Sequence, residues 1–216
     1  MHIEPGVLDA AKIAAANAAA LGTLGASAIG FVRRPADLAK TLLAALFFSI
    51  FMQVWHLPVG PSELHLIGAS AIYFTFGFLP TLFGFALGLV LQGLIFEPQD
   101  LVHLGVNSLS LMVPLVAVHV AFGRRFFARD GIETRWTSVL KFDAAYYAGV
   151  VAMVGFWLAL GQEPTPLQSW ATFAASYLPL VALEPLFTLL VLKGLKRFEG
   201  TAAVRKLTAA PQLRFA

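Results

Sequence analysis

The stretch DLAKTLLAALFFSIFMQVW at residues 37–55 decides the class of fold. After Lys40 it carries no charged residue, and its length is about the 20 residues that a helix needs to cross the hydrocarbon core of a bilayer. Similar runs recur along the 216 residues, of which 58% are hydrophobic and only 12% charged. Such a composition excludes an ordinary soluble domain and predicts an all-α, multi-pass bundle embedded in a lipid bilayer.

Working outward from this stretch, we find seven apolar segments. They cover residues 7–32, 37–55, 64–79, 80–96, 104–122, 139–160 and 170–192. The third and fourth are divided at the Leu79-Pro80 step, because proline weakens helix continuity. We expect one integral membrane domain over residues 1–200 and a cytoplasmic tail over 201–216. The spans leave no room for a soluble catalytic domain, so any ATP hydrolysis must come from a partner.

The basic residues test this count independently. Of the 15 Lys and Arg, all except Lys12 flank the first loop, flank the loop between the fifth and sixth spans, or follow the last span. They are Arg33, Arg34, Lys40, Arg124, Arg125, Arg129, Arg135, Lys141, Lys193, Lys196, Arg197, Arg205, Lys206 and Arg214. The positive-inside rule then predicts an external N-terminus and a cytoplasmic C-terminus, which requires an odd number of spans.

We predict that the N-terminal apolar segment is a helix of the protein and not a cleaved signal peptide. Its arginines follow the apolar stretch, whereas a signal peptide has its positive charge in front of that stretch. Small residues recur at a spacing of four and permit another helix to approach closely, and we expect this packing inside the bundle. They are Ala14, Ala18, Gly22, Ala26 and Gly30.

Composition also limits the chemistry. The chain has no cysteine, which excludes disulfides, zinc thiolate sites and iron–sulfur clusters. Metal ligation is left to histidine, carboxylate, methionine, amide or terminus groups. The net charge of +3 comes from basic residues confined to particular loops and does not indicate a nucleic-acid partner.

The first two residues can form most of a metal chelate. The amine of Met1, the amide nitrogen of His2 and its near imidazole nitrogen close two adjacent chelate rings. A fourth nitrogen would complete the square plane that Ni(II) and Cu(II) prefer. His65 shares the predicted outer face and can supply that nitrogen, with His56 and His103 as competitors. His119 lies toward the cytoplasmic end, where we expect a hydrogen bond within the bundle.

Several stretches together resemble the CbiM/NikM family, the cobalt- and nickel-binding membrane components of energy-coupling factor transporters. They are MHIEPGVL at residues 1–8, the region from Phe51 to Gly68, LGVNSL at residues 104–109 and LEPL at residues 183–186. The resemblance covers nearly the whole chain. It implies a six-helix substrate-binding fold with an extra N-terminal helix, in agreement with the seven segments.

The resemblance also implies a function and a ligand set. Transported Co(II) or Ni(II) would be the substrate, with no permanently bound cofactor, and the ligands would be Met1, His2 and His65. The implied partners are a transmembrane coupling subunit, cytosolic ATPases and a small accessory membrane subunit, in a bacterial-type plasma membrane. The chain departs from the family pattern at two positions near the ligands. Glu63 replaces a common glycine, and His56 stands where asparagine is frequent, so it is a candidate substitute ligand or supporting residue.

Other polar residues could orient these ligands. Asn107, Ser70 and Ser108 are candidate partners for a ligating histidine, although an interhelical hydrogen bond would serve Asn107 equally well. Glu184 is an intramembrane carboxylate, which is costly enough to indicate a structural partner or a polar station on the metal's route. We expect Asn17 and Gln92 to pack within the bundle.

Functions of other classes are also compatible with a membrane bundle. An intramembrane hydrolase is disfavoured, because the chain has neither a GxSxG nor an HExxH motif. A metal-independent scaffold, or a carrier of another micronutrient, would tolerate residues added before Met1. A chelate built on the terminal amine would not.

Overall fold

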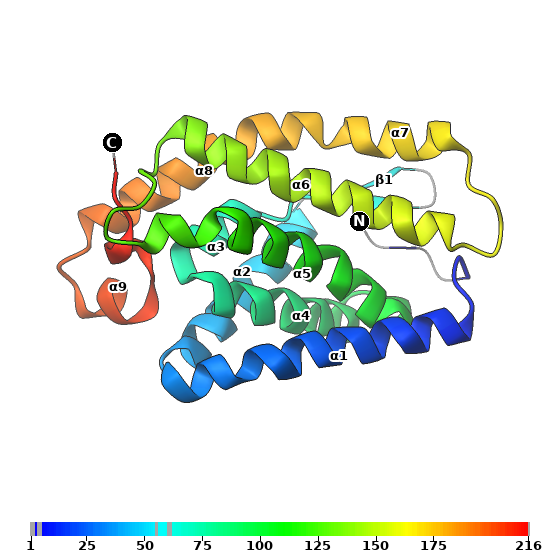
Figure 1. The fold of residues 1–216 in the computed structure, drawn as a ribbon, viewed down its shortest axis with the longest axis horizontal. Coiled ribbons are helices and arrows are strands. Elements are labelled where there is room, and N and C mark those ends of the chain that lie inside the picture. Colours follow the sequence, from blue (N-terminus) through cyan, green and yellow to red (C-terminus); the bar gives the residue numbers. More distant parts are fainter. Residues whose placement is uncertain (1–2, 4–5, 55, 60–61, 216) are drawn as a thin grey trace.

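A computed structural model describes every residue except 1–2, 4–5, 55, 60–61 and 216. The long helices lie side by side along the long axis of the molecule (Figure 1). They are α1 (Ala10–Arg33), α2 (Asp37–Val54), α4 (Phe78–Ile95), α5 (Leu104–Ala121), α6 (Trp136–Ala159) and α8 (Leu178–Arg197). Shorter elements are α3 (Ala69–Phe76), α7 (Leu167–Ser176), α9 (Ala202–Leu207), the strands β1 (His56–Val59) and β2 (Ser62–His65), and the 3₁₀ turns η1 (Pro98–His103), η2 (Gly123–Phe127) and η3 (Ala210–Gln212).

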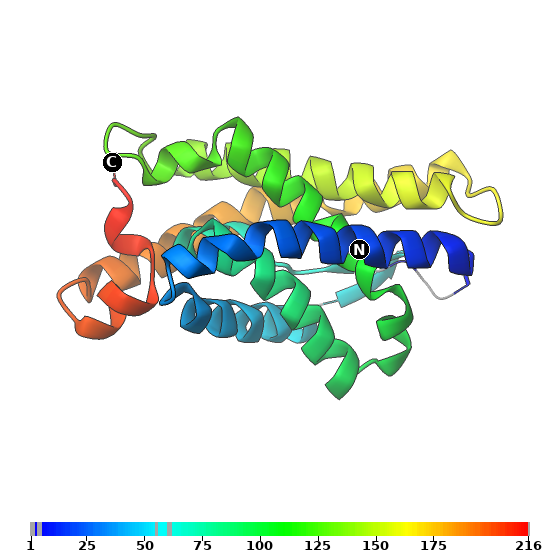
Figure 2. The ribbon, with the colours of Figure 1, turned by 60° about the horizontal axis from the view of Figure 1, so that its bottom comes forward.

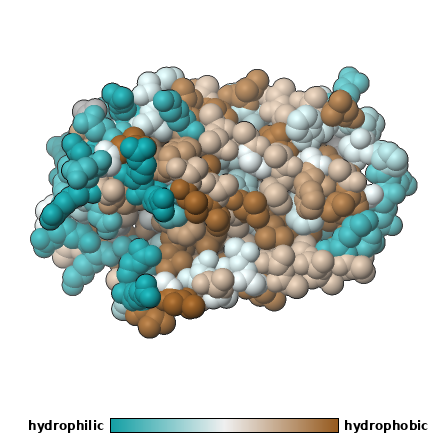
Figure 3. Space-filling model, in the orientation of Figure 1, coloured by the Kyte–Doolittle hydropathy of each residue, from teal (hydrophilic) through white to brown (hydrophobic). Residues whose placement is uncertain are grey.

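The surface carries the pattern expected of a membrane protein. Hydrophilic residues gather at the two ends of the long axis and an apolar region lies between them (Figure 3). Large apolar side chains such as Leu42, Ile50 and Leu190 are exposed there. Lipid tails can solvate these side chains as well as a protein core does. The predicted membrane bundle is confirmed.

Aromatic and small residues build the interior. Tyr73, Phe74 and Phe142 pack with ring centroids 4.6 to 5.3 Å apart. On α4, Gly84 and Gly88 let the helix approach α2 so closely that an added Cβ would lie 2.4 to 2.6 Å from α2 side-chain atoms. Because packing in a bilayer depends on close contact, these glycines fix the α2–α4 pair.

Six helical segments in the described part of the chain are long and apolar enough to cross a membrane. The expected third span is not among them. Residues 62–65 form β2, residues 66–68 form the turn after it, and the helix α3 covers only Ala69–Phe76. This mixed segment is buried along most of its length, so its hydropathy resembles that of a helix.

The break before α4 is at Gly77 and not at the Leu79-Pro80 step. Gly77 has φ +88°, a left-handed conformation that ends α3. Pro80 is the third residue of α4. Amide groups in the first turn of a helix have no intrahelical partner, so proline costs little there.

The expected last span begins earlier and is interrupted. It covers Leu167–Arg197, and Tyr177 separates α7 from α8. Pro179 in the first turn of α8 cannot donate the hydrogen bond that would continue α7. The tail then folds back on the bundle, where the amide of Ala209 donates to the carbonyl of Thr75 at 2.6 Å.

Only the last residue of the small-residue ladder of α1 packs inside the bundle, where a Cβ added at Gly30 would lie 2.8 Å from the side chain of Leu79. Ala14, Ala18, Gly22 and Ala26 are exposed, and no atom lies within 4 Å of a Cβ added at Gly22. The helix lies along the bottom edge of the bundle in Figure 1 and crosses in front of the other helices in Figure 2. It turns Ala16 and Ala20 inward instead, and its contacts are mainly with α5.

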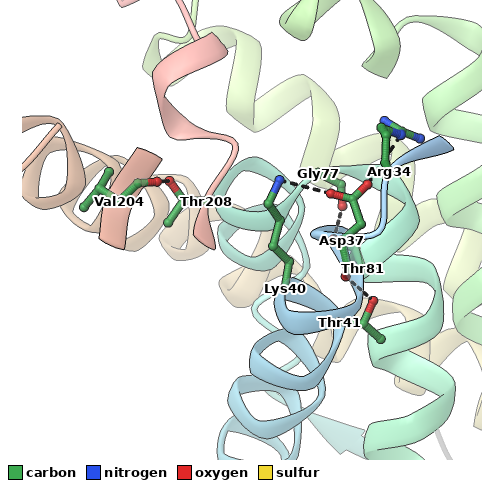
Figure 4. A network of polar contacts seen from close by, with 8 residues as sticks. All are labelled: Arg34, Asp37, Lys40, Thr41, Gly77, Thr81, Val204 and Thr208. Carbon is green, nitrogen blue, oxygen red and sulfur yellow. Dashed lines mark hydrogen bonds and ion pairs between the residues drawn. The ribbon is translucent and has the colours of Figure 1, made fainter. Parts of the chain in front are cut away.

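A polar network holds the basic end of the bundle together. The carboxylate of Asp37, nearly buried at the start of α2, contacts Lys40 Nζ at 3.0 Å and Arg34 Nε at 3.4 Å (Figure 4). Thr81 donates to the carbonyl of Gly77 in the same region. The ion pairs of Asp37 join the end of α1 to the start of α2, and the bond of Thr81 closes the first turn of α4.

Candidate metal centre

A two-stranded hairpin carries the predicted ligand His65 into the bundle. β1 and β2 pair antiparallel, with His56 opposite His65 and Pro58 opposite Glu63. Gly68, with φ +65°, turns the chain from β2 into α3, and its missing side chain leaves room for the ring of Phe51. A Cβ at this position would lie 2.4 Å from that ring. The hairpin therefore ends in a position that only glycine fills without strain.

The start of the chain lies against the same hairpin. Ile3 is fully buried and forms an antiparallel bridge with Ser62. Its amide donates to the side-chain oxygen of Asn107 at 3.1 Å. Met1 and His2 lie outside the described residues. They directly precede Ile3, whose bridge partner Ser62 is the residue before Glu63.

His65 is fully buried, and protein groups hold both of its ring nitrogens. Nδ1 is 3.3 Å from the carbonyl of Met52, and Nε2 is 3.0 Å from Oε2 of Glu63. A carbonyl and a carboxylate both accept hydrogen bonds, so this arrangement contains a proton on each nitrogen or on the acid. A metal ion arriving at Nε2 would displace one proton, while the carbonyl of Met52 would keep the ring oriented.

The competing histidines occupy different positions. His56 is exposed, and its ring stacks on that of His65 with centroids 5.8 Å apart and planes at 18°. His103 is buried at the start of α5, with no hydrogen-bond partner for its ring among the described residues. His119 bonds Tyr73 at 2.7 Å and stacks on Phe78, which confirms its expected place within the bundle.

The candidate supporting residues separate into two groups. Asn107 accepts the hydrogen bond from the amide of Ile3, as described above. Ser70 lies in a second polar cluster, where its hydrogen-bond partners are Glu184, Asp143 and Thr188. No hydrogen bond between the described atoms joins it to His65. Asn17 accepts from the amide of Gly105 at 2.8 Å and joins α1 to α5, as expected of a packing residue.

This second cluster is built around two buried carboxylates. Glu184 of α8 accepts from the amide of Ser70 at 3.0 Å and from the hydroxyl of Tyr147. Asp143 of α6 lies 3.0 Å from the hydroxyl of Ser70, which also contacts Thr188 at 2.7 Å. The structural partner expected for Glu184 is thus the start of α3.

The sequence analysis missed Asp143 and the contact of Glu63 with His65. Asp143 could have been found from the sequence, because burying a carboxylate inside an apolar span costs free energy and therefore indicates a polar partner. The contact of Glu63 depends on the strand, where alternate residues face the same side. Among the described residues no three His, Asp or Glu converge as a metal site, so ligation by Met1 and His2 has no test in the structure.

Taken together, the apolar surface and the helical bundle define a multi-pass membrane protein. A solved structure described as the crystal structure of a transition metal transporter is similar to this chain, with a TM-score of 0.72 over 95% of this chain and 97% of that chain. At 20% identity this likeness shows the fold alone. A search of curated proteins finds no significant match.

Residues 2–202 match the family model described as CbiM, cobalt uptake substrate-specific transmembrane region. The chain belongs to the CbiM family. It is a transmembrane component for cobalt uptake, a transport subunit and not an enzyme.

Proposed function

We propose that the chain captures Co(II) or Ni(II) at its outer face through four nitrogens. Three come from the amine of Met1 and the amide and imidazole of His2, and the fourth is Nε2 of His65. The observation that carries this proposal is the bridge between Ile3 and Ser62, because it brings the start of the chain to the hairpin that holds His65.

The surroundings of His65 favour a ligand role. The carbonyl of Met52 fixes the ring through Nδ1, and metal-bound histidines commonly have such an acceptor on the nitrogen that does not bind the metal. Asn107 supports the proposed ligands at the start of the chain, because its side chain accepts a hydrogen bond from the amide of Ile3, the residue after His2.

Binding at this site requires the loss of protons. The terminal amine, the imidazoles and the amide of His2 must all be deprotonated to donate to the metal, so affinity falls as the pH falls. Nε2 of His65, which contacts Glu63 in the metal-free protein, must also be free of a proton to bind the metal. Acidification therefore favours the metal-free hairpin.

The energy for uptake comes from partners. We infer a transmembrane coupling subunit, cytosolic ATPases and a small accessory membrane subunit, as the family implies. The outward-facing ladder at Ala18, Gly22 and Ala26 supports this inference, because small residues let a partner helix approach closely.

The deciding experiment measures Ni(II) and Co(II) binding to the purified full chain with its natural start and with one extra residue before Met1. We expect the extension, His2→Ala and His65→Ala each to weaken binding by more than about 100-fold, since each removes a ligand. His119→Ala, at the opposite end, is the control and should bind normally. Unchanged affinity in the extended chain would overturn the proposed site.

A further inference from the structure

Glu63 presents a carboxylate beside the nitrogen of His65 that would bind the metal. Both residues are on β2, where alternate side chains project to the same side of the strand. The side chain of Glu63 is 19% exposed and that of His65 is fully buried, and Oε2 of the carboxylate lies 3.0 Å from Nε2 of the imidazole. Any ion that reaches Nε2 must therefore come close to this carboxylate.

The separation of these two atoms suits two neighbouring ligands of one metal. Bonds from a transition metal to imidazole nitrogen or carboxylate oxygen are about 2.0–2.2 Å long. Two such ligands at a right angle are then roughly 2.9–3.0 Å apart. Oε2 of Glu63 and Nε2 of His65 are 3.0 Å apart. The two atoms are therefore spaced as neighbouring ligands of one metal would be.

The orientation of the imidazole is fixed before a metal arrives. The carbonyl of Met52 holds Nδ1 at 3.3 Å, and the ring of His56 stacks on one face at an interplanar angle of 18°. The carboxylate of Glu63 then occupies a defined direction relative to the ring. A rigid pair of this kind is what a specific metal site requires.

We propose that Glu63 is an additional, oxygen ligand of the captured metal. This inference rests on the proposed function. In that site the four nitrogens fill a plane around the metal, so the carboxylate takes the position above the plane and the centre becomes five-coordinate. It is the feature of this chain that distinguishes its site from a square of four nitrogens.

A fifth ligand changes the preference between the two metals. A square plane of nitrogens suits Ni(II) especially well. A carboxylate on the axis removes part of this advantage, whereas Co(II) readily accepts five donors. Since selectivity is a difference of two affinities, Glu63 shifts the balance toward Co(II).

X-ray absorption at the metal edge of the loaded full-length protein tests the inference directly. We expect five nitrogen or oxygen donors around Co(II) in the natural chain and four in Glu63→Gln. The same substitution should weaken Co(II) binding about 10- to 100-fold more than Ni(II) binding, a split that a purely structural role would not produce. Glu163→Gln, an exposed carboxylate at the same end, is the matched control and should leave both unchanged.

The outcomes separate this inference from the proposed function. Four donors in the natural chain, or equal losses for the two metals, would overturn the role of Glu63 while binding that depends on the terminus remains. The donor count of the natural chain needs no variant, so a misfolded Glu63→Gln leaves the test intact. Failure of the natural chain to bind either metal would instead overturn the proposed function.

Discussion

Asn107 connects the body of the bundle to the first residues of the chain. Its side-chain oxygen accepts the buried amide of Ile3, and no other hydrogen bond to that amide exists among the described residues. In Asn107→Ala this donor loses its partner, which costs about 1–3 kcal/mol when the donor stays buried. Ile3 would then leave its place for part of the time, and the proposed ligands Met1 and His2, which precede it in the chain, would be held less well.

We therefore expect Asn107→Ala to weaken metal binding about 10-fold or more, as measured by competition with a chelator of known affinity. Asn17→Ala is a matched control, because it removes the analogous bond to Gly105 between α1 and α5. That variant should lower the melting temperature and leave affinity intact. An Asn107→Ala protein with natural affinity would contradict this role.

At the level of single residues the sequence predicts a set of ligands, which stays a prediction, but it does not predict which side chains contact one another. Met1, His2 and His65 follow from chelate chemistry, shared placement and family resemblance. Ser70 is different, because its proximity in sequence to His65 suggests a supporting role whereas the structure joins it to Glu184 and Asp143. The turn at Gly68 directs the chain away from the hairpin, and no local pattern reveals where it leads.

Among the secondary-structure elements, α3 depends most on its neighbours. It has only eight residues, and its N-cap, Gly68, offers no side chain to the free amides of the first turn. The carboxylate of Glu184 on α8 accepts one of them, from Ser70, and is held in turn by Tyr147 of α6. A residue from another helix thus performs the task of a cap.

Removal of that carboxylate should destabilise the junction of α3, α6 and α8. For Glu184→Ala we expect a loss of about 2–4 kcal/mol, because several buried donors lose their acceptor at once. Glu184→Gln keeps one acceptor oxygen and should lose less than half of that amount. Thermal unfolding in detergent measures both, with Glu163→Ala as the surface control. Equal stability of the Ala and natural proteins would rule out this capping role.

Hydropathy predicts the bounds of some elements well and fails for others. The expected segment 37–55 corresponds to α2 (Asp37–Val54) and the segment 104–122 to α5 (Leu104–Ala121), because uniform apolar runs bounded by charges or polar turns fix their ends. Residues 64–79 are equally apolar, but β2 ends at His65 and α3 begins only at Ala69. The segment is buried along most of its length and carries no periodicity that separates strand from helix. The hairpin is therefore the part of the fold that hydropathy did not predict.

On the scale of the whole molecule, the two ends differ in charge. The amide of Thr134 donates to the carbonyl of Arg214 at 2.6 Å, which joins the loop before α6 to the C-terminal segment. Arg34 and Lys40 lie at the same end (Figure 4). The hairpin and the start of α1 lie away from it, and Lys12 is neutralised there by Asp9 at 2.7 Å. The positive-inside rule predicts that the basic end lies in the cytoplasm, so we expect the metal centre to face outward.

This orientation can be tested cleanly, because the chain contains no cysteine. Glu163→Cys and Lys206→Cys each introduce one exposed thiol, at the ends of the molecule that carry the hairpin and the basic residues. A maleimide that does not cross membranes should label the first thiol in intact cells and the second only after permeabilisation. The cysteine-free chain gives the background, and both variants must retain metal binding for the comparison to count. The reverse labelling pattern would place the metal centre in the cytoplasm, where capture from outside is impossible, and would overturn the predicted direction of uptake.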